Sequence, residues 1–413
     1  MTSTKTILVI GTYDTKSDEL RYLQTCIERQ GGRVLTMDVS VLGDPPDVPS
    51  IGKHEVAVAA GSSIQQAIDA NDENTAMQIM AAGASKLTRK LYDDGQIHAM
   101  IALGGTMGTD LALDCAQALP MGVPKYIVST VSFSPLIPPD RLSPDIQMIL
   151  WAGGLYGLNS VCKSSLSQAA GAVLGAARAV EPPDRSRPLI GMTSLGSSCL
   201  MYMKRLLPEL EQRGFEVAIF HATGMGGMAY EGLAAEGAFA AVMDFAPPEL
   251  ANLVLGSVVH SGKDRMRSAG RAGIPQLIAP GGTDMFDFPT YVGPPERFKD
   301  RPYHAHNRLI ASSVLGPDER REVARAIAER AAEAKGPVHV LLPVRGIEEW
   351  DKAGGPCHNP DGLAAFVDEM RRVVRPPVPM TALDCHINDP AFCDAALKIF
   401  DAWVADGTIK ARR

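Results

Sequence analysis

The segment Ala99-Met-Ile-Ala-Leu-Gly-Gly-Thr-Met-Gly-Thr109 decides the fold. Its first part, 99–103, is a short and continuously apolar run, which is typical of a strand buried on both faces of a parallel sheet. Three glycines and two threonines follow at 104–109, directly before a helical pattern at 109–119. A strand, a glycine-rich turn and a helix in this order indicate an α/β protein.

The same alternation of short apolar runs and helical patterns continues on both sides of this segment. The first half of the chain predicts strands at 6–10, 33–39 and 126–130 and helices at 17–30, 74–92 and 158–179. The second half predicts strands at 189–193, 215–220, 239–243, 276–279 and 338–342, and helices at 200–213, 228–235, 317–335, 363–374 and 390–405. The fold class we expect is α/β, with two Rossmann-like lobes, mainly parallel sheets and a cleft between the lobes.

A polar segment separates the two series of elements. Glu181-Pro-Pro-Asp-Arg-Ser-Arg-Pro188 has three prolines, four charged residues and no apolar periodicity. Such composition is typical of a linker between domains. We therefore predict an N-terminal nucleotide-binding lobe at 1–180, a linker at 181–187 and a C-terminal lobe at 188–413.

Composition and charge exclude several classes of protein. The chain has 413 residues, of which 46% are hydrophobic and 21% are charged, so it is long enough for two or three folded domains. The formal net charge is −7, which gives no bulk attraction to nucleic acid or to an anionic membrane. We expect a small-molecule substrate and neither nucleic acid nor a membrane as partner.

The cysteine pattern and the N-terminus indicate a cytoplasmic protein. Seven cysteines are present, an odd number, and none forms a Cys-x-x-Cys pair. The chain runs from Met1 into an apolar run at 6–10 without the features of a secretory signal. The most apolar region, 146–180, is interrupted by glycines and Lys163, which predicts a buried core helix rather than a membrane span.

Two loops of the first half follow strands, where ligands of open parallel sheets bind. Gly11-Thr-Tyr-Asp-Thr-Lys16 could present helical N–H groups and the Lys16 charge to an anion. Helix capping by Thr15 or Ser17 is an alternative interpretation of this loop. The loop 104–109 would let phosphate oxygens approach the backbone, although a tight turn that needs glycine for packing would have the same sequence.

Neighbouring strand ends could complete the same crevice. Asp38 ends the second predicted strand, where an acidic residue can bind ribose hydroxyls; a surface role is the alternative. Ser129 and Thr130 end a further strand and could line the crevice.

The second half contains a denser set of chemical groups. His221 ends a strand, a glycine-rich loop follows, and Glu231 lies on the next helix, so His221 could act as general acid or base with Glu231 orienting it. A buried histidine and a surface glutamate would be the structural alternative. Asp284 and Asp287 could bind a cation through oxygen ligands or could form turns. His304 and His306 lack further ligands at zinc-binding spacing.

An ordered set of motifs resembles a known family. The motifs are Gly11-Thr-Tyr-Asp-Thr-Lys16, Gly104-Gly-Thr-Met-Gly-Thr109, Phe220-His-Ala-Thr-Gly-Met-Gly-Gly227, Asp284-Met-Phe-Asp-Phe288, His304-Ala-His-Asn307 and His386-Ile-Asn-Asp-Pro390. Together they resemble, over nearly the whole chain, the family that includes the N-terminal, ATP-binding domain of the tomato mosaic virus resistance protein. The resemblance implies two Rossmann-like lobes, ATP with Mg²⁺ on the N-terminal lobe, and a homodimer.

The resemblance also implies site residues and shows two departures. Nucleotide contacts are expected at 14–16 and 104–109, and Ser50 falls in a block that resembles another part of the nucleotide pocket. Thr106 stands where serine is expected, and Asp287 stands where asparagine is expected. Many relatives continue into a TIM-barrel domain, and because this chain stops at Arg413 we expect that C-terminal domain to be lacking.

These observations lead to one expectation about function and one alternative. We expect an enzyme, a kinase or a ligase, that uses ATP and Mg²⁺ on a small polar metabolite; the alternative is a nucleotide-regulated protein-binding module without turnover. The expected catalytic residues are His221, Glu231, Arg265 and Asp284. The expected nucleotide-binding residues are Gly11, Thr12, Asp14, Thr15, Lys16, Asp38, Ser50, Gly104, Gly105, Thr106, Met107, Gly108, Thr109, Ser129 and Thr130.

Overall fold

The computed structural model describes residues 4–154, 156–181, 183, 184 and 186–410. The chain divides into two compact units, Met1–Pro182 and Pro183–Arg413, which we call the first lobe and the second lobe. Pro182 and Arg185 of the predicted linker lie outside the described residues.

The first lobe contains a five-stranded parallel sheet in the order β2-β1-β3-β4-β5. Its strands are β1 (Thr6–Gly11), β2 (Arg33–Asp38), β3 (Ala99–Gly104), β4 (Lys125–Ser129) and β5 (Ile146–Leu150). Its helices are α1 (Ser17–Arg29), α2 (Lys53–Ala59), α3 (Ile64–Asp69), α4 (Glu73–Asp93), α5 (Thr106–Ala118) and α6 (Ser160–Ala179), with a short 3₁₀ helix η1 (Pro139–Arg141).

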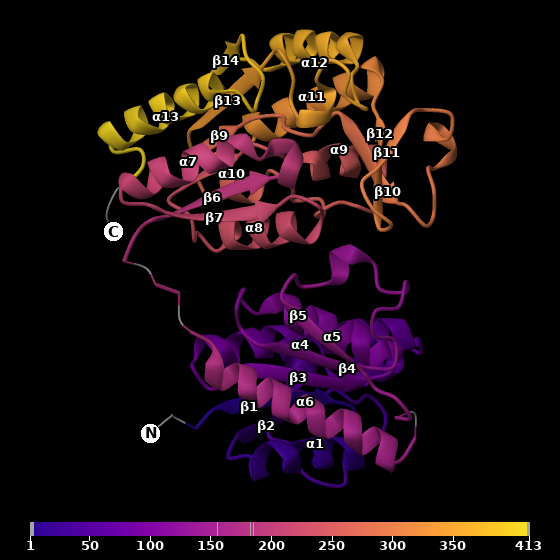
Figure 1. Ribbon diagram of the computed structural model, residues 1–413. Coiled ribbons are helices and arrows are strands. Elements are labelled where there is room, and N and C mark those ends of the chain that lie inside the picture. The colour runs from indigo at the N-terminus through magenta and orange to yellow at the C-terminus, as the bar shows by residue number, and fades with distance from the viewer. Residues whose placement is uncertain (1–3, 155, 182, 185, 411–413) are drawn as a thin grey trace. The chain divides into compact units, whose positions relative to one another are not determined.

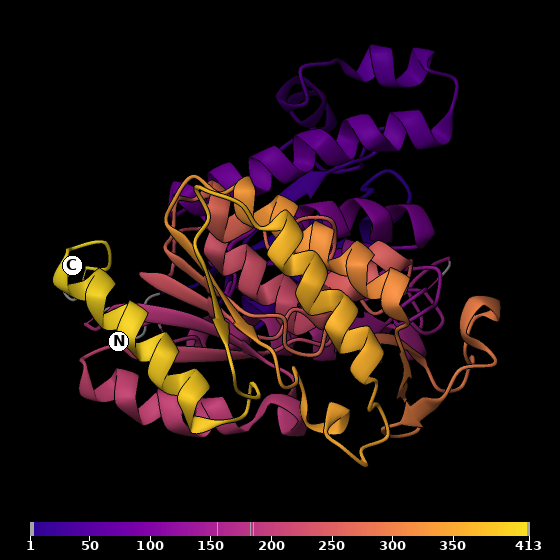
Figure 2. The ribbon, with the colours of Figure 1, turned by 90° about the horizontal axis from the view of Figure 1, so that it is seen from above.

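Helices cover both faces of this sheet because its central strands are apolar on both sides. In β1, Ile7 and Val9 pack in the core beneath α1 and α6, whereas Leu8 and Ile10 pack in the core beneath α2, α4 and α5. Figure 1 shows α6 lying across its face of the sheet, and Figure 2 shows the short helices that precede the long α4 beside it. The continuous apolar runs in the sequence reflect this burial on two sides.

The order of the strands creates a crevice at one edge of the sheet. From β1 the chain moves through α1 to β2 on one side, whereas β3 lies on the other side and is followed by α5 on the opposite face. The order therefore reverses between β1 and β3, and such switch points are where open α/β sheets bind ligands. The loops after β1 and β3 both begin there.

The second lobe repeats this order and adds one strand and a small sheet. A six-stranded parallel sheet has the order β14-β13-β9-β8-β6-β7, and a three-stranded antiparallel sheet has the order β10-β12-β11. The strands are β6 (Leu189–Ser194), β7 (Glu216–His221), β8 (Ala241–Asp244), β9 (Gln276–Ile278), β10 (Met285–Pro289), β11 (Tyr303–Ala305), β12 (Ile310–Val314), β13 (Val338–Pro343) and β14 (Met380–Leu383).

Helices again cover both faces of the large sheet. They are α7 (Met201–Gln212), α8 (Met225–Ala235), α9 (Pro248–Leu255), α10 (Ser268–Arg271), α11 (Pro317–Ala332), α12 (Pro360–Val373) and α13 (Pro390–Ala405), with 3₁₀ helices η2 (Gly196–Cys199), η3 (Glu296–Phe298) and η4 (Glu349–Asp351). One face packs against α7 and α13, and the other packs against α9, α11 and α12. Both views show α11 and α12 side by side (Figures 1 and 2).

The expected fold class, α/β with mainly parallel sheets, is confirmed. One local prediction was wrong: the apolar region from Ile146 does not begin as a helix, because 146–150 forms the edge strand β5. A short apolar run without alternation does not distinguish strand from helix. Helices α2, α3, α9 and α10 and the antiparallel sheet were not predicted. None of the helices in the described part of the chain is long and apolar enough to span a membrane.

Candidate functional site

A cavity of about 770 Å³ lies at the switch point of the first lobe. The loops after β1, β2 and β3 line it together with α3 and the start of α4. Its lining residues are Thr12, Asp14, Thr15, Lys16, Val39, Ser40, Val41, Leu42, Ala67, Ile68, Asn71, Asp72, Glu73, Ala76, Met77, Gly104, Gly105, Thr106, Met107 and Gly108. Of the fifteen residues predicted to bind nucleotide, nine therefore line one cavity.

The glycine loop after β3 forms one wall of this cavity. A Cβ atom at Gly104 would lie 2.6 Å from the Cα atom of Gly108, so the turn into α5 requires glycine at 104. A Cβ atom at Gly105 would meet a single neighbour, Thr130 Oγ1, at 3.9 Å. Gly105 is the N-cap of α5 and provides no side-chain cap, so the first N–H groups of the helix are available to a ligand.

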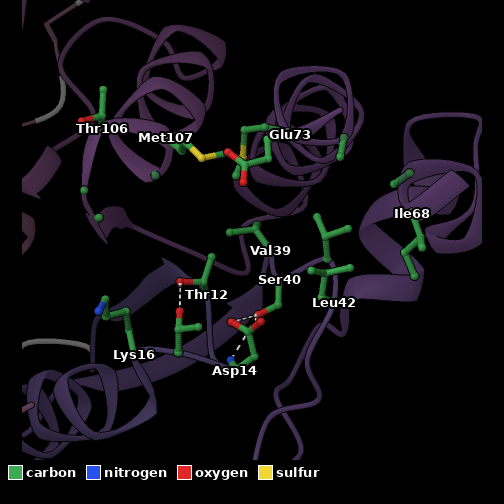
Figure 3. A pocket seen from close by; sticks show the side chains of 18 of the residues that line it. Thr12, Asp14, Lys16, Val39, Ser40, Leu42, Ile68, Glu73, Thr106 and Met107 are labelled. Carbon is green, nitrogen blue, oxygen red and sulfur yellow. Dashed lines mark hydrogen bonds between the residues drawn. The ribbon is translucent and has the colours of Figure 1, made fainter. Parts of the chain in front are cut away.

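The loop after β1 is held by its own hydrogen bonds. The N–H groups of Thr15 and Lys16 donate to Thr12 O, and the hydroxyl groups of Thr12 and Thr15 lie 3.0 Å apart. Asp14 accepts from Ser40 Oγ at 3.0 Å and from Gly43 N at 3.2 Å. These bonds join the β1 loop to the segment after β2 and orient Asp14 along the cavity wall (Figure 3).

The cavity has a polar end and a mainly apolar end, although Asn71, Asp72 and Glu73 between α3 and the start of α4 also line it. Thr12 and Lys16 lie at one end in Figure 3, whereas Leu42 and Ile68 lie at the other. The Lys16 ammonium also lies 5.8 Å from the centre of the Trp151 ring, an arrangement that positions a cation next to the polar end. The remaining apolar side chains come from the segment after β2, from α3 and α4, and from the start of α5: Val39, Val41, Ala67, Ala76, Met77 and Met107.

Three residues that were predicted to contact the nucleotide make contacts within the protein instead. Asp38 is fully buried, and its Oδ1 accepts hydrogen bonds from the N–H groups of Tyr13 and Ser40, so the predicted ribose contact is not available to it. Ser50 bonds to Thr36 across a bridge beside β2 and does not line the cavity. Gly11 is buried at the end of β1, against Leu20.

Thr109, Ser129 and Thr130 support the glycine loop from behind. Thr109 Oγ1 donates to Gly105 O at 2.7 Å and lies 2.6 Å from Ser129 Oγ, and both side chains are buried. Thr130 N donates to Gly104 O. These residues fix the position of the loop and are not part of the cavity lining.

In the second lobe, Arg265 is fully buried among three carboxylates. Its guanidinium donates to both oxygens of Asp244 at 2.5 and 2.7 Å, to Glu249 at 2.8 Å and to Glu231 at 3.2 Å. Glu231 also accepts from the N–H groups of Met266 and Ser268. This geometry argues against the predicted catalytic roles of Glu231 and Arg265, because their polar atoms are engaged away from solvent. His221, at the end of β7, is exposed.

Burial dominates the electrostatics of this cluster. Burial, opposed by the Arg265 charge, raises the pKa of Glu249 to about 7 and raises the pKa of Glu231. Glu249 accepts from the N–H groups of Gly224 and Gly227 at the start of α8, so a protein carboxylate already occupies the anion-binding position of that helix.

Asp284 and Asp287 lie in different surroundings. Asp287 accepts from Ser312 Oγ and Asn252 Nδ2 and is therefore fully hydrogen-bonded. Neither oxygen of Asp284 has a hydrogen-bond partner among the described residues, and its nearest cation there is Arg320 Nη2 at 3.6 Å. Burial raises the pKa of Asp284 to about 6, and burial and the Asp284 charge raise the pKa of Glu348 to about 10. Asp284 is thus inside the lobe rather than in an open active site.

Eleven of the lining residues were not predicted from the sequence. Seven of them are apolar, and the other four are Ser40, Asn71, Asp72 and Glu73. Val39 to Leu42 follow β2 directly, so the rule that ligands bind beyond strand ends could have found them. Ala67 and Ile68 lie on α3, which was not predicted, whereas Met77 lies on α4, which was predicted at 74–92. The sequence has no signal that brings these residues to the crevice.

Comparison with known proteins places both lobes in one family. The N-terminal domain of the uncharacterised protein family UPF0261 matches residues 5–182, and the C-terminal domain of that family matches residues 187–404. The expectation that a C-terminal domain is lacking is wrong for the family's own C-terminal domain, which is present at residues 187–404.

Relatives match along nearly the whole chain. A UPF0261 protein of Brucella melitensis biotype 1 is 57% identical over 99% of this chain and 98% of its own length. A UPF0261 protein of Clostridium tetani is 33% identical over 95% of this chain and 98% of its own length. The ToMV resistance protein Tm-1(GCR237) of Solanum lycopersicum is 28% identical over 95% of this chain and 55% of its own length.

Among solved structures, E. coli ADP-heptose LPS heptosyltransferase II matches with a TM-score of 0.22 and 8% identity over 98% of this chain and 99% of its own length. At this score the match carries no weight for function. The two domain matches and the two bacterial relatives show common descent. The chain therefore belongs to the UPF0261 family.

Proposed function

We propose that the first lobe binds ATP with Mg²⁺ in the cavity at the β1/β3 switch point. The observation that carries this proposal is the division of one cavity into a polar end, with a glycine loop and an uncapped helix, and an apolar end. A nucleotide has the same two parts. A volume of about 770 Å³ is within the range of about 300–1,000 Å³ that is common for small-molecule sites.

The polar end suits a polyphosphate. The N–H groups at the start of α5 and the dipole of that helix favour an anion, and the open space at Gly105 lets phosphate oxygens come close to the backbone. Lys16 supplies a positive charge at the same end. The hydroxyl groups of Thr12 and Thr15 supply further donors.

The oxygen ligands at this end also fit Mg²⁺. Mg²⁺ is commonly held by one or two carboxylates together with substrate phosphates and water. Asp14 lines the cavity and is half-buried, and each of its oxygens accepts one hydrogen bond, from Ser40 and Gly43, which leaves a second lone pair for the ion; the hydroxyl groups of Thr12 and Thr15 line the same wall. The ion would neutralise part of the phosphate charge, which matters because Asp72 and Glu73 also border the cavity.

The apolar end suits a purine base. Val39, Leu42, Ile68 and Met77 offer flat apolar contact of the kind that covers an aromatic ring. The choice of adenine over other bases rests on the family resemblance, since apolar contact alone does not distinguish purines.

We propose further that the protein is a cytoplasmic homodimer that uses ATP on a small polar metabolite. All seven cysteines are free thiols, as expected in a reducing compartment. Tyr291, Val292 and Leu309 lie on or beside the small antiparallel sheet with 81, 69 and 73% of their surface exposed, which is apolar area that a second copy could cover. Light scattering should give about twice the chain mass; the mass of a single chain would reject the dimer.

Calorimetric titration tests nucleotide binding directly. ATP with Mg²⁺ should bind with a stoichiometry of one per chain, whereas adenosine should bind far more weakly because it lacks the phosphate contacts. No saturable binding of ATP at millimolar concentration would reject the proposal.

Turnover is tested separately. The protein, ATP and Mg²⁺ are incubated with pools of sugar acids and similar metabolites while ADP, AMP and phosphate are followed. Substrate-dependent release that is lost in His221→Ala supports an enzyme, because His221 is the exposed member of the predicted catalytic set. Tight binding of ATP without turnover in every pool supports the alternative, a nucleotide-regulated binding module.

A further inference from the structure

A buried polar centre lies at the carboxyl edge of the large sheet in the second lobe. Asp284 follows β9, Glu348 follows β13, and Arg320 reaches the centre from α11. Asp351, on η4, lies beside them. Each of these side chains is at most 8% exposed. We call these four residues the Asp284 centre.

The groups of the Asp284 centre act on one another at short range. Arg320 Nη2 lies 3.6 Å from Asp284 Oδ2. Among the charged neighbours of Glu348, Asp284 exerts the largest electrostatic effect, followed by Asp351 and Arg320. The loops that carry Asp284 and Glu348 are also joined directly, because Gly282 N donates a hydrogen bond to Ile347 O at 3.1 Å.

Several polar atoms of the Asp284 centre lack hydrogen-bond partners among the described residues. Both carboxylate oxygens of Asp284, Glu348 Oε1 and both terminal nitrogens of Arg320 are buried without a hydrogen bond in the described part of the chain. Buried polar atoms are rarely left unsatisfied in native proteins, so a group beyond these side chains must satisfy several of them.

The formal charges identify the sign of that missing group. With all three carboxylates ionised, the centre carries a formal charge of −2 in a buried region, and this burial together with the Asp284 charge is what raises the pKa of Glu348 to about 10 when no cation is bound. Asp351 is already engaged, because its oxygens accept from Ile347 N and lie 3.2 Å from His386 Nε2. Asp284 and Glu348 keep free oxygens among the residues described.

We propose that the second lobe holds one divalent cation of the Mg²⁺ or Mn²⁺ type between the free oxygens of Asp284 and Glu348. A charge of +2 balances the centre, and carboxylate oxygens are the ligands that such hard cations prefer. Asp284 would bridge the ion and the Arg320 guanidinium, which needs only a small closure of the present 3.6 Å separation.

The rest of the coordination shell would be water. No three His, Cys, Asp or Glu side chains converge as ligands of one ion among the residues that the structure describes. Mg²⁺ usually keeps several waters and is bound by one or two carboxylates, often together with substrate phosphates, so a third protein carboxylate is not required. Asp287 takes no part, because Ser312 and Asn252 occupy its oxygens.

Manganese titration in the absence of nucleotide tests the proposal. The purified full-length protein is treated with chelator, exchanged into metal-free buffer and titrated with MnCl₂, and free Mn²⁺ is measured by electron paramagnetic resonance. We expect one saturable site per chain. The isosteric variants Glu348→Gln and Asp284→Asn should each weaken Mn²⁺ binding at least tenfold, because each removes a charged oxygen ligand.

Two control variants show whether the Mn²⁺ signal belongs to this site. Glu349→Gln makes the same change at the next residue, whose carboxylate pairs with Lys352, and should keep the Mn²⁺ affinity of the wild type. Gly105→Val alters the first-lobe cavity and should also keep it, so that loss of ATP binding and loss of this cation site are distinguishable. Absence of a saturable site in the wild type would show that water fills the centre and would overturn the proposal.

A crystal of the wild-type protein soaked in MnCl₂ gives an answer that does not depend on the folding of any variant. An anomalous peak within coordination distance of both Asp284 and Glu348 is the expected result. Binding that survives in both Glu348→Gln and Asp284→Asn, or an anomalous peak only elsewhere, would refute the assignment.

Discussion

The substitution Gly105→Val separates nucleotide binding from folding. Gly105 has φ −72°, which any residue can adopt, and a Cβ atom at this position would have one neighbour, Thr130 Oγ1, at 3.9 Å. Valine caps a helix less well than glycine, but it also reduces the entropy of the unfolded chain, and each effect is of the order of 1 kcal/mol. We therefore expect the free energy of unfolding to change by less than about 1 kcal/mol.

The effect on ATP should be much larger. The valine side chain would occupy the space through which phosphate oxygens approach the start of α5. A hydrogen bond to a charged group contributes about 1.5–3 kcal/mol, so the loss of one or two bonds costs about 3 kcal/mol. Since about 1.4 kcal/mol corresponds to a factor of ten, the dissociation constant should rise by about 100-fold.

Calorimetry with ATP and Mg²⁺ measures the affinity, and urea denaturation measures the stability. Gly52→Val is the matched control, because Gly52 is the N-cap of α2, has φ −86° and has no atom within 4 Å of its Cβ position. The control should bind ATP like the wild type. Unchanged ATP affinity in a folded Gly105→Val protein would refute the assignment of the glycine loop as the phosphate site.

Three further predictions concern charged groups. Lys16→Gln should weaken ATP binding by about tenfold at low salt and leave adenosine binding unchanged, because it removes a positive charge at the polar end; equal losses for both ligands in calorimetry would contradict this. Arg265→Ala should lower the free energy of unfolding by about 3–5 kcal/mol, because it leaves Asp244, Glu231 and Glu249 without their buried cation; a melting temperature within a few degrees of the wild type would refute the structural role. Glu249 has a folded-state pKa of about 7, above the ordinary value of 4.5, so the folded protein binds its proton more tightly and stability should fall as the pH rises from about 4.5 to 7 and level off above it. Urea denaturation at several pH values measures how steeply the free energy of unfolding falls with pH. This slope should be smaller in Glu249→Gln than in the wild type by up to about 1.4 kcal/mol per pH unit, and identical slopes would exclude Glu249 as its source.

The sequence predicted the parallel sheets because their strands are apolar on both faces and are separated by helices. The run 99–103 and the turn 104–109 needed no tertiary information, since Gly104 is required by the local backbone of the turn. The helices α2 and α3 escaped prediction because they have 7 and 6 residues, too few for a periodic pattern.

About half of the residues that line the candidate site were predicted from the sequence. Residues such as Thr12, Lys16 and Gly105 follow strands directly, and the topology brings them together. Asp38 also ends a strand, but its side chain turns inward to hold the N–H groups of Tyr13 and Ser40, and no pattern in the sequence distinguishes these orientations. In the sequence, Arg265 is one charged residue of a loop, and no pattern indicates that it is buried among carboxylates in the folded protein.

The most direct test of the central claim is a crystal structure of the protein with ATP and Mg²⁺. The account predicts that the triphosphate lies against the N–H groups at the start of α5, between Lys16 and the glycine loop, with the base among Val39, Leu42 and Ile68. Density for ATP at another place, or no density together with no heat of binding in solution, would contradict it.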